Sequence, residues 1–179
     1  YASPAIDHIL IHTGQNYDYE LNQIFFDDLG IRKPDFFLDA AGANAAETVG
    51  QILIKIDALL EKVKPDAFMV LGDTNSCLAV IPAKRRKIPI FHMEAGNRCK
   101  GENLPEEVIR RIVDVTSDVN LCYSEHARRY ILESGVKPEY THVVGSPICE
   151  ILSERMDQIN ESKVLETLGL ESGNYILLS

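Results

Sequence analysis

The sequence lacks the patterns that mark several common classes of protein. No apolar run approaches the roughly 20 residues of a membrane helix. The N-terminus carries no basic segment followed by an apolar one, so we expect neither a membrane association nor a signal peptide. No segment repeats, and none is of low complexity. A globular protein remains, and the 45% hydrophobic and 25% charged residues are typical of one.

Motifs that hold metals or nucleotides at a fixed spacing are also missing. The four cysteines form no CxxC pair and the five histidines show no HExxH spacing, so we expect no metal site. We interpret the cysteines as free buried thiols in a reducing cytoplasm, and the histidines as packing or surface residues. Neither GxGxxG nor GxxxxGK[ST] occurs, which argues against a dinucleotide cofactor and a P-loop. We therefore expect no cofactor.

Positive charge is scarce. The chain has 18 Lys and Arg against 27 Asp and Glu, a formal net charge of −9. Its short basic run, residues 84–87, is most simply a solvated helix end, where cations suit the helix dipole. A nucleic-acid partner is not expected, because such proteins usually display a basic patch.

The apolar residues alternate between strand and helix patterns along the 179 residues. Strand and helix in alternation predict an α/β fold with a Rossmann-like parallel sheet and right-handed crossovers. Runs that are apolar throughout predict helices on both faces of that sheet. The expected strands are 6–12, 36–38, 67–71, 88–91, 119–122 and 142–144, and the expected helices between them are 18–29, 49–63, 75–86, 106–116 and 124–133.

The clearest helix has one apolar stripe that runs from Val49 to Val63. Asn44 and Glu47 have the spacing of a capping box before it, and Pro65 ends it. Pro82 lies inside the expected helix 75–86 and predicts a kink there. After residue 147 the pattern changes to two helices, 147–158 and 162–168, followed by a strand at 175–179.

Carboxylates follow the predicted strands. Ligands of such sheets bind outside the carboxyl ends of the strands, which is where Asp73, Glu94 and Glu106 are expected to gather. Taken singly, Asp73 could cap the helix that follows it, and Glu106 could be a first-turn acid favoured by the dipole. Three acids in one crevice can instead raise one pKa and prepare a general acid or base.

Two arginines, Arg98 and Arg110, are candidate partners for a diphosphate or a carboxylate. Surface ion pairing is the alternative role for each of them. The glycines after the strands would let a backbone approach phosphates closely.

Several strings occur together and in one order that resembles the non-hydrolysing UDP-N-acetylglucosamine 2-epimerase family. The resemblance covers residues 6–179, and its wording is closer to the branch that acts on UDP-2-acetamido sugars of surface polysaccharides. The strings are His12-Thr13-Gly14-Gln15-Asn16-Tyr17-Asp18, Gly72-Asp73-Thr74-Asn75-Ser76, His92-Met93-Glu94-Ala95-Gly96-Asn97-Arg98, Pro105-Glu106-Glu107 and Gly145-Ser146-Pro147.

The resemblance implies two Rossmann-like domains in the arrangement called GT-B, with a UDP-sugar in the cleft between them. It implies inversion at C2 without NAD, by elimination of UDP to a glycal and its re-addition while C2 is reprotonated on the other face. A homodimer is also implied. The implied catalytic residues are Asp73, Glu94 and Glu106, and the implied substrate-binding residues are Gln15, Arg98, Arg110 and Ser146.

The sequence departs from the family in two ways. Ile109 stands where the family has Asn. The family also begins with a strand and a Gly-Thr-Arg-Pro-Glu loop, and this sequence begins at Tyr1 without them. We therefore expect a fragment that is inactive alone, with residues 1–147 as an incomplete first domain and residues 148–179 as a linker helix and the start of a second.

Three other readings stay open on the sequence. A hydrolysing 2-epimerase would release the free sugar and UDP. A GT-B glycosyltransferase shares the architecture, although the strings around Glu94 and Glu106 argue against it. A non-catalytic sugar-nucleotide-binding module is the third.

Overall fold

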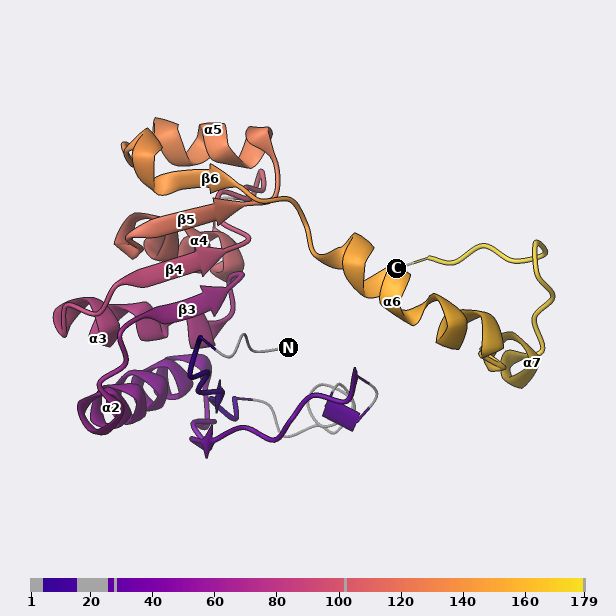
Figure 1. Cartoon of the computed structure of the whole chain (residues 1–179), viewed down its shortest axis with the longest axis horizontal. Helices are drawn as coiled ribbons and strands as arrows, with labels where there is room; N and C mark the ends of the chain where they lie inside the picture. The colour runs from indigo at the N-terminus through magenta and orange to yellow at the C-terminus, as the bar shows by residue number, and fades with distance from the viewer. Residues whose placement is uncertain (1–4, 16–25, 28, 102, 179) are drawn as a thin grey trace. The chain divides into compact units, whose positions relative to one another are not determined.

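The computed structural model describes residues 5–15, 26–27, 29–101 and 103–178 (Figure 1). The chain forms two compact units, Tyr1–Val144 and Gly145–Ser179. The first unit contains the acids predicted for the site. Assignment of the two units to two domains of a longer protein stays a prediction.

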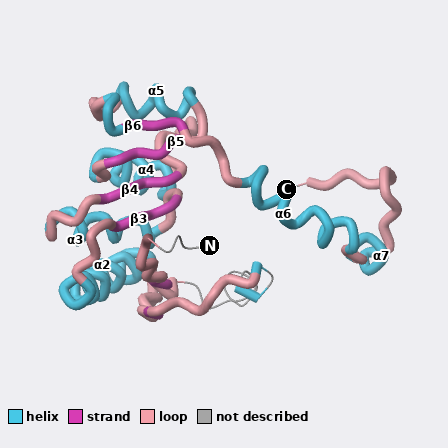
Figure 2. Tube along the Cα trace, in the orientation of Figure 1, coloured by secondary structure: helices cyan, strands magenta, loops and turns pink. Residues whose placement is uncertain are grey.

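The first unit is built on parallel strands. Strands β3 (Phe68–Leu71), β4 (Ile90–Met93), β5 (Val119–Cys122) and β6 (Thr141–Val143) form one sheet in that order (Figure 2). Strands β1 (Ile11–His12) and β2 (Phe36–Phe37) form a separate parallel pair. Because every pairing is parallel, the carboxyl ends of β3 to β6 lie at one edge. The expected α/β class with a parallel sheet is confirmed.

Helices connect the strands of this unit. Helix α4 (Pro105–Thr116) and helix α5 (Glu125–Glu133) agree with the predictions to within a residue. Helix α2 (Ala45–Val63) begins as expected, because the Asn44 side chain accepts from the Glu47 amide at 3.0 Å. The return bond of the capping box differs, since the Glu47 carboxylate accepts from the amide of Ala43 at 2.9 Å.

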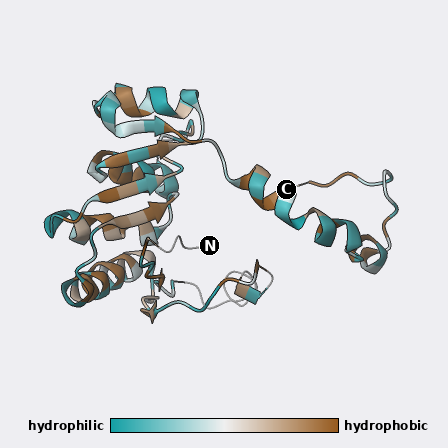
Figure 3. Cartoon of the chain, viewed as in Figure 1, coloured by the Kyte–Doolittle hydropathy of each residue, from teal (hydrophilic) through white to brown (hydrophobic). Residues whose placement is uncertain are grey.

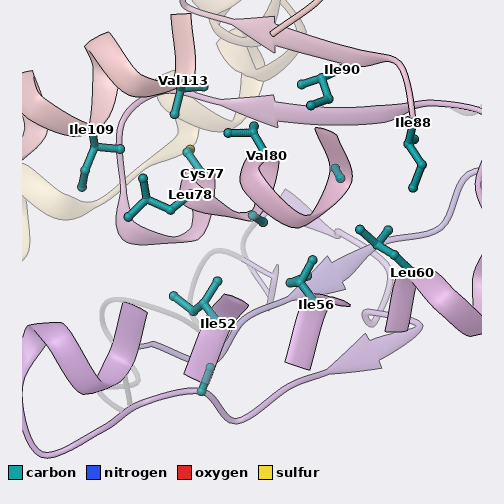
Figure 4. Packing of buried hydrophobic residues seen from close by; sticks show 13 residues of the cluster. Ile52, Ile56, Leu60, Cys77, Leu78, Val80, Ile88, Ile90, Ile109 and Val113 are labelled. Carbon is teal, nitrogen blue, oxygen red and sulfur yellow. The ribbon is translucent and has the colours of Figure 1, made fainter. Parts of the chain in front are cut away.

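The core lies on one face of the four-stranded sheet. Helix α2 points its apolar stripe at the 3₁₀ helix η2 (Asn75–Ala79) and at α3 (Val80–Arg85), as Figure 4 shows. Figure 3 shows the matching alternation of hydrophobic and hydrophilic bands along α2. The two faces of β3 differ, because Phe68 and Val70 pack against this core while Met69 and Leu71 are 59% and 54% exposed. The buried apolar cluster consists of Ala40, Ile52, Ile56, Leu60, Cys77, Leu78, Ala79, Val80, Ala83, Ile88, Ile90, Ile109 and Val113.

Several predicted elements have different bounds. The strand expected over 6–12 is reduced to β1, because its partner β2 is itself two residues long. The strand expected at 88–91 starts at Ile90, since the Ile88 amide turns back to the Ala83 carbonyl at 3.1 Å. The kink expected at Pro82 appears as a change from η2 to α3 at Val80, where Pro82 cannot donate to the carbonyl of Leu78. Of the helix expected at 18–29, residues 18–25 and 28 lie outside the described residues.

The second unit contains helix α6 (Ile148–Glu161) and helix α7 (Val164–Leu168), close to the two predicted helices. The strand expected at 175–179 is wrong for the four residues described, 175–178, which have no strand conformation. Ile176, Leu177 and Leu178 are 94%, 83% and 93% exposed. A strand needs a neighbour to accept its hydrogen bonds, and none pairs with these residues within the described part of this unit.

Candidate functional site

Asp73 and Glu94 are brought together at the carboxyl edge of the sheet. Asp73 comes two residues after β3, and Glu94 comes directly after β4, its neighbour. Gly72 has φ +78° and its amide donates to the Met93 carbonyl at 3.1 Å. A Cβ added at Gly72 would lie 3.6 Å from Glu94 Oε2, so this carboxylate lies beside the backbone that leads into Asp73.

Glu94 has an unusual backbone. Its φ of +64° lies in the left-handed region, which non-glycine residues seldom adopt and which costs on the order of 1–3 kcal/mol. Its Oε1 accepts from Asn97 Nδ2 at 2.9 Å. Backbone strain of this kind concentrates at functional sites, where the surrounding structure holds it in place.

The surroundings of these two acids carry excess negative charge. Burial raises the pKa of the Cys77 thiol, and the charges of Asp73 and Glu94 raise it further. Burial likewise raises the pKa of Tyr123, to which Glu94 adds. The charges of Asp73 and Glu94 thus both reach Cys77, while only that of Glu94 acts on Tyr123.

Helix α4 presents two adjacent glutamates in opposite directions. Glu106, the predicted catalytic acid, is exposed in the first turn. Glu107 is fully buried and accepts from Arg110 at 3.0 Å, from Arg111 at 2.8 Å and from the Cys99 amide at 3.2 Å. Burial alone would raise the pKa of Glu107, but these donors outweigh it and lower the pKa below its ordinary value.

Sequence reasoning missed Glu107. A usable signal was present, because Glu107 has arginines three and four residues later and Asp114 seven residues later, all on one side of a helix.

Arg110 connects the buried Glu107 to Asp73 at the carboxyl edge of the sheet. Its guanidinium pairs with Asp73 and with Glu107. Burial acts to lower the pKa of Arg110, but these two carboxylates raise it above its ordinary value. Arg110 therefore lies where the sequence predicted a cation, next to a predicted catalytic acid.

Arg98 is engaged differently. Its side chain is 10% exposed and pairs with Asp114 Oδ2 at 2.6 Å, while its Nε lies 3.9 Å from Glu107 Oε1. The ion pairing considered for Arg98 therefore occurs in the interior rather than at the surface. Its role in substrate binding stays a prediction.

His92 is the fully buried histidine of β4, and both of its ring nitrogens lie against polar groups. Its Nε2 donates to the Gly72 carbonyl at 2.9 Å. Its Nδ1 lies 3.0 Å from Asp114 Oδ1, a close electrostatic contact outside hydrogen-bond geometry. Asp114, also fully buried, accepts from the Gly96 amide at 3.2 Å.

Gln15 lies three residues after β1. Between them, the Thr13 hydroxyl forms a 2.6 Å hydrogen bond with the Ser76 hydroxyl, which connects the end of β1 to the segment after Asp73. Gln15 Oε1 is buried and has no hydrogen-bond partner within the described residues. An unpaired buried oxygen is costly, so it fits a group that receives a donor from a ligand.

Ser146 and Ile109 were singled out on other grounds. Ser146 belongs to the second unit, where its hydroxyl accepts from the Ile148 amide at 3.4 Å, and its contact with substrate stays a prediction. Ile109 is 7% exposed and packs in the core with Val113, so this departure from the family changes the interior rather than the crevice.

The cysteines match their interpretation in part. All four are free, but Cys77 and Cys122 are buried while Cys99 is half-buried and Cys149 is exposed. No three His, Cys, Asp or Glu side chains group as metal ligands among the residues described. None of the described helices combines the length and apolar character needed to cross a membrane.

Comparison with known proteins gives a consistent family. Residues 1–179 match the family described as UDP-N-acetylglucosamine 2-epimerase. UDP-2,3-diacetamido-2,3-dideoxy-D-glucuronate 2-epimerase of Pseudomonas aeruginosa is 36% identical over 141 residues, which cover 78% of this chain and 40% of that protein.

Solved structures agree. The structure of UDP-N-acetylglucosamine 2-epimerase from Rickettsia bellii has a TM-score of 0.85 and 56% identity, over 92% of this chain and 44% of that one. The Methanocaldococcus jannaschii UDP-GlcNAc 2-epimerase in complex with UDP-GlcNAc and UDP has a TM-score of 0.83 and 31% identity, over 88% of this chain and 44% of that one. The chain thus spans less than half the length of these relatives.

Proposed function

Since the chain belongs to the UDP-N-acetylglucosamine 2-epimerase family, we propose that it forms much of the first, catalytic domain of a longer isomerase. That enzyme inverts C2 of a UDP-2-acetamido sugar. The juxtaposition of Asp73 and Glu94 against Gly72 carries the proposal, because it puts two carboxylates at the ligand-binding edge of the sheet.

The chemistry needs groups that move a proton at C2. One group removes the C2 proton while the bond from C1 to the UDP oxygen breaks, which leaves a glycal and UDP. UDP then re-forms the bond to C1, and C2 receives a proton on its other face. We assign the proton transfers to the set Asp73, Glu94 and Glu106, since positioned carboxylates perform general acid and base catalysis.

Two further residues fit the departing diphosphate and the sugar. Arg110 already faces Asp73 and supplies positive charge near the point where the leaving group becomes more negative. Gln15 offers a buried oxygen without a partner in the described residues, which suits a hydroxyl or amide donor of the sugar. Arg98 and Ser146 complete the proposed substrate-binding set.

The substrate class rests on relatives. One is named for a UDP-2,3-diacetamido uronate and another is solved with UDP-GlcNAc bound. Both sugars carry an acetamido group at C2 and UDP at C1. We propose that the longer protein takes a UDP-2-acetamido sugar of this kind and feeds polysaccharide precursors.

The deciding experiment follows C2 in deuterated water. The longer protein, given UDP-GlcNAc and a UDP-diacetamido uronate in separate reactions without NAD or metal, is expected to place solvent deuterium at C2 of the epimer. Full turnover without deuterium would contradict this mechanism. Free sugar and UDP as the final products would show the hydrolysing reaction instead.

The isolated 179-residue chain is expected to bind UDP weakly and to leave UDP-sugars unchanged. It spans 44% of the relative that holds UDP-GlcNAc and UDP. A cleft between two domains holds its ligand from both walls, and charge contacts weaken when one wall is replaced by water. Calorimetric titration with UDP and an epimerisation assay test this, and micromolar binding with turnover would show a complete enzyme in this segment.

We further propose that the longer protein is a cytoplasmic homodimer. Helix α4 supports this assembly, because Val108, Ile112 and Val115 lie one and two turns apart and are 47%, 36% and 59% exposed. Light scattering of the longer protein is expected to give twice the mass of one chain. Val115→Asp is expected to give the single-chain mass if this stripe forms the contact.

A further inference from the structure

We propose that His92 is a positioning residue that holds the two acid-bearing loops at a fixed spacing. The proposal rests on the proposed function, because it gives His92 its role through Asp73 and Glu94. His92 itself lies beneath both loops, fully buried on β4.

On the Asp73 side, the His92 ring contacts the backbone carbonyl of Gly72. His92 Nε2 lies 2.9 Å from the Gly72 carbonyl, and a carbonyl oxygen only accepts, so Nε2 carries the proton. This bond fixes the peptide group between Gly72 and Asp73. Gly72 is also bound through its amide to the Met93 carbonyl at 3.1 Å, so both of its backbone groups are held by β4.

On the Glu94 side, Asp114 of α4 holds the loop through the Gly96 amide. With the proton on Nε2, His92 Nδ1 presents a lone pair at 3.0 Å from Asp114 Oδ1 and forms no hydrogen bond with it, while that oxygen accepts from the Gly96 amide at 3.2 Å. Asp114 Oδ2 is held by Arg98 at 2.6 Å. Glu94 stands between His92 and Gly96 in the chain, so the His92–Gly72 bond holds the backbone before it and the Asp114–Gly96 bond holds the loop after it.

The backbone of these loops explains why they need such anchors. Gly72, Glu94 and Gly96 all have positive φ, at +78°, +64° and +82°. A strained conformation persists only when its neighbours over-determine it. An apolar residue at position 92 would fill the same volume but would leave the Gly72 carbonyl without its donor.

The expected consequence is geometric. A displacement of about 1 Å in a reacting group can cost on the order of 10²-fold in rate. Loss of the link from His92 to Gly72 releases the peptide before Asp73 while substrate contacts stay in place. The turnover number should therefore fall, and KM should change little.

The test uses two histidine replacements in the longer protein that each keep one half of the arrangement. In His92→Gln the amide nitrogen occupies the place of Nε2 and can still donate to the Gly72 carbonyl. In His92→Asn the amide takes the place of Nδ1, beside Asp114, and the Gly72 carbonyl loses its donor. We expect kcat to fall on the order of 10²-fold in His92→Asn and about tenfold in His92→Gln, with KM within about threefold.

Asn120→Ala is the matched control. Asn120 is also fully buried, lies beside His92 in the sheet register and donates to the backbone carbonyl of Asp114 at 3.1 Å. Among the described residues, the Asn120 side chain forms no hydrogen bond with either acid-bearing loop. Its replacement is expected to lower the melting temperature while kcat is retained.

The outcomes separate cleanly. If both histidine variants melt earlier but keep the kcat of the unaltered protein, as the control does, His92 is a packing residue and the inference is overturned. If His92→Asn does not fold, the kcat of His92→Gln against the control decides in the same way. If the unaltered protein neither epimerises UDP-sugars nor exchanges C2, the proposed function itself fails and this role fails with it.

Discussion

The inner side of α4 and the rim of the crevice both carry carboxylates, but the two regions treat them differently. On the inner side, Glu107 and Asp114 are fully buried and each receives hydrogen bonds from arginine and from a backbone amide. At the carboxyl edge of the sheet, here called the rim, Glu94 receives one hydrogen bond from Asn97. Glu106 is exposed in the first turn of α4, and its place at this rim stays a prediction. The same chemical group is thus surrounded by donors in one region and left accessible in the other.

This difference separates structural acids from acids that can do chemistry. A carboxylate surrounded by donors is stabilised in its charged form, and the groups around it block the approach of a substrate. A carboxylate with one partner keeps free lone pairs and can exchange a proton. Asp73 lies between the two kinds, because Arg110 joins it to Glu107.

The largest expected effect is on the rim. Replacement of Glu94 by Gln in the longer protein removes a proton-transfer group and is expected to lower turnover by on the order of 10²–10⁴-fold. Stability should change little, because the amide can still accept from Asn97. Turnover and thermal melting are measured side by side, and a variant that melts earlier yet keeps full turnover removes Glu94 from the mechanism.

Two adjacent glutamates offer the sharpest version of the comparison. Glu107→Gln removes the charge of the buried carboxylate that accepts from Arg110, Arg111 and the Cys99 amide, and is expected to cost about 3–5 kcal/mol of unfolding free energy. Glu106→Gln should lower turnover and cost at most about 1 kcal/mol, the contribution of a first-turn acid. Urea unfolding and turnover assays of both variants check this, and equal stability losses would break the distinction between the two regions.

The loop that joins the two regions should also tolerate little change. A Cβ at Gly96 would lie 2.2 Å from the Ala127 carbonyl oxygen, and Gly96 also has a φ of +82°. Gly96→Ala is therefore expected to lower the free energy of unfolding by at least about 2 kcal/mol. Gly50 is the control, because it lies inside α2 with open space around it. Gly50→Ala should raise the free energy of unfolding by about 0.5–1 kcal/mol. Urea unfolding of both variants measures the difference.

The smallest expected effect is on the melting temperature at acidic pH. The pKa of Glu107 is lowered in the folded chain, so its contribution to stability is present above its ordinary pKa of 4.5 and is lost as pH falls through the lower folded value. The melting temperature of the unaltered chain should therefore decline below that pH more steeply than that of Glu107→Gln. Parallel declines would show that Glu107 does not contribute through its charge.

Much of the fold was accessible from the sequence because its signals are local. The apolar stripe of α2, its Asn44 cap and the continuous run of β5 each predict their element from a few neighbouring residues. The strand expected at 175–179 failed, at the residues described, for the opposite reason. Its apolar run is correct for a strand, but a strand also depends on a partner elsewhere in the chain.

The site shows the same limit. Asp73 and Glu94 were predicted to meet because the ends of neighbouring parallel strands must meet. The burial of Glu107 depends instead on which side of α4 faces the sheet, although its arginine partners are three and four residues away. His92 contacts the Gly72 carbonyl and the Asp114 carboxylate, which lie far along the chain. Those contacts are tertiary, so no spacing rule for metals or nucleophiles reveals them.

Because β1 and β2 form a sheet of their own, the backbone amides of the two sheets are expected to exchange with solvent at different rates. Strands β1 and β2 are two residues long each and, within the described ranges, pair with no other strand, whereas β4 has a partner on either side. Short pairs of this kind open locally at a small fraction of the global free energy. The amides of Leu38 and Ala40, bonded to His12 and Thr13, should therefore exchange with solvent well before those of β4. Gln15 would then belong to the part of the unit that opens first, and ligand protection of those amides would report its engagement.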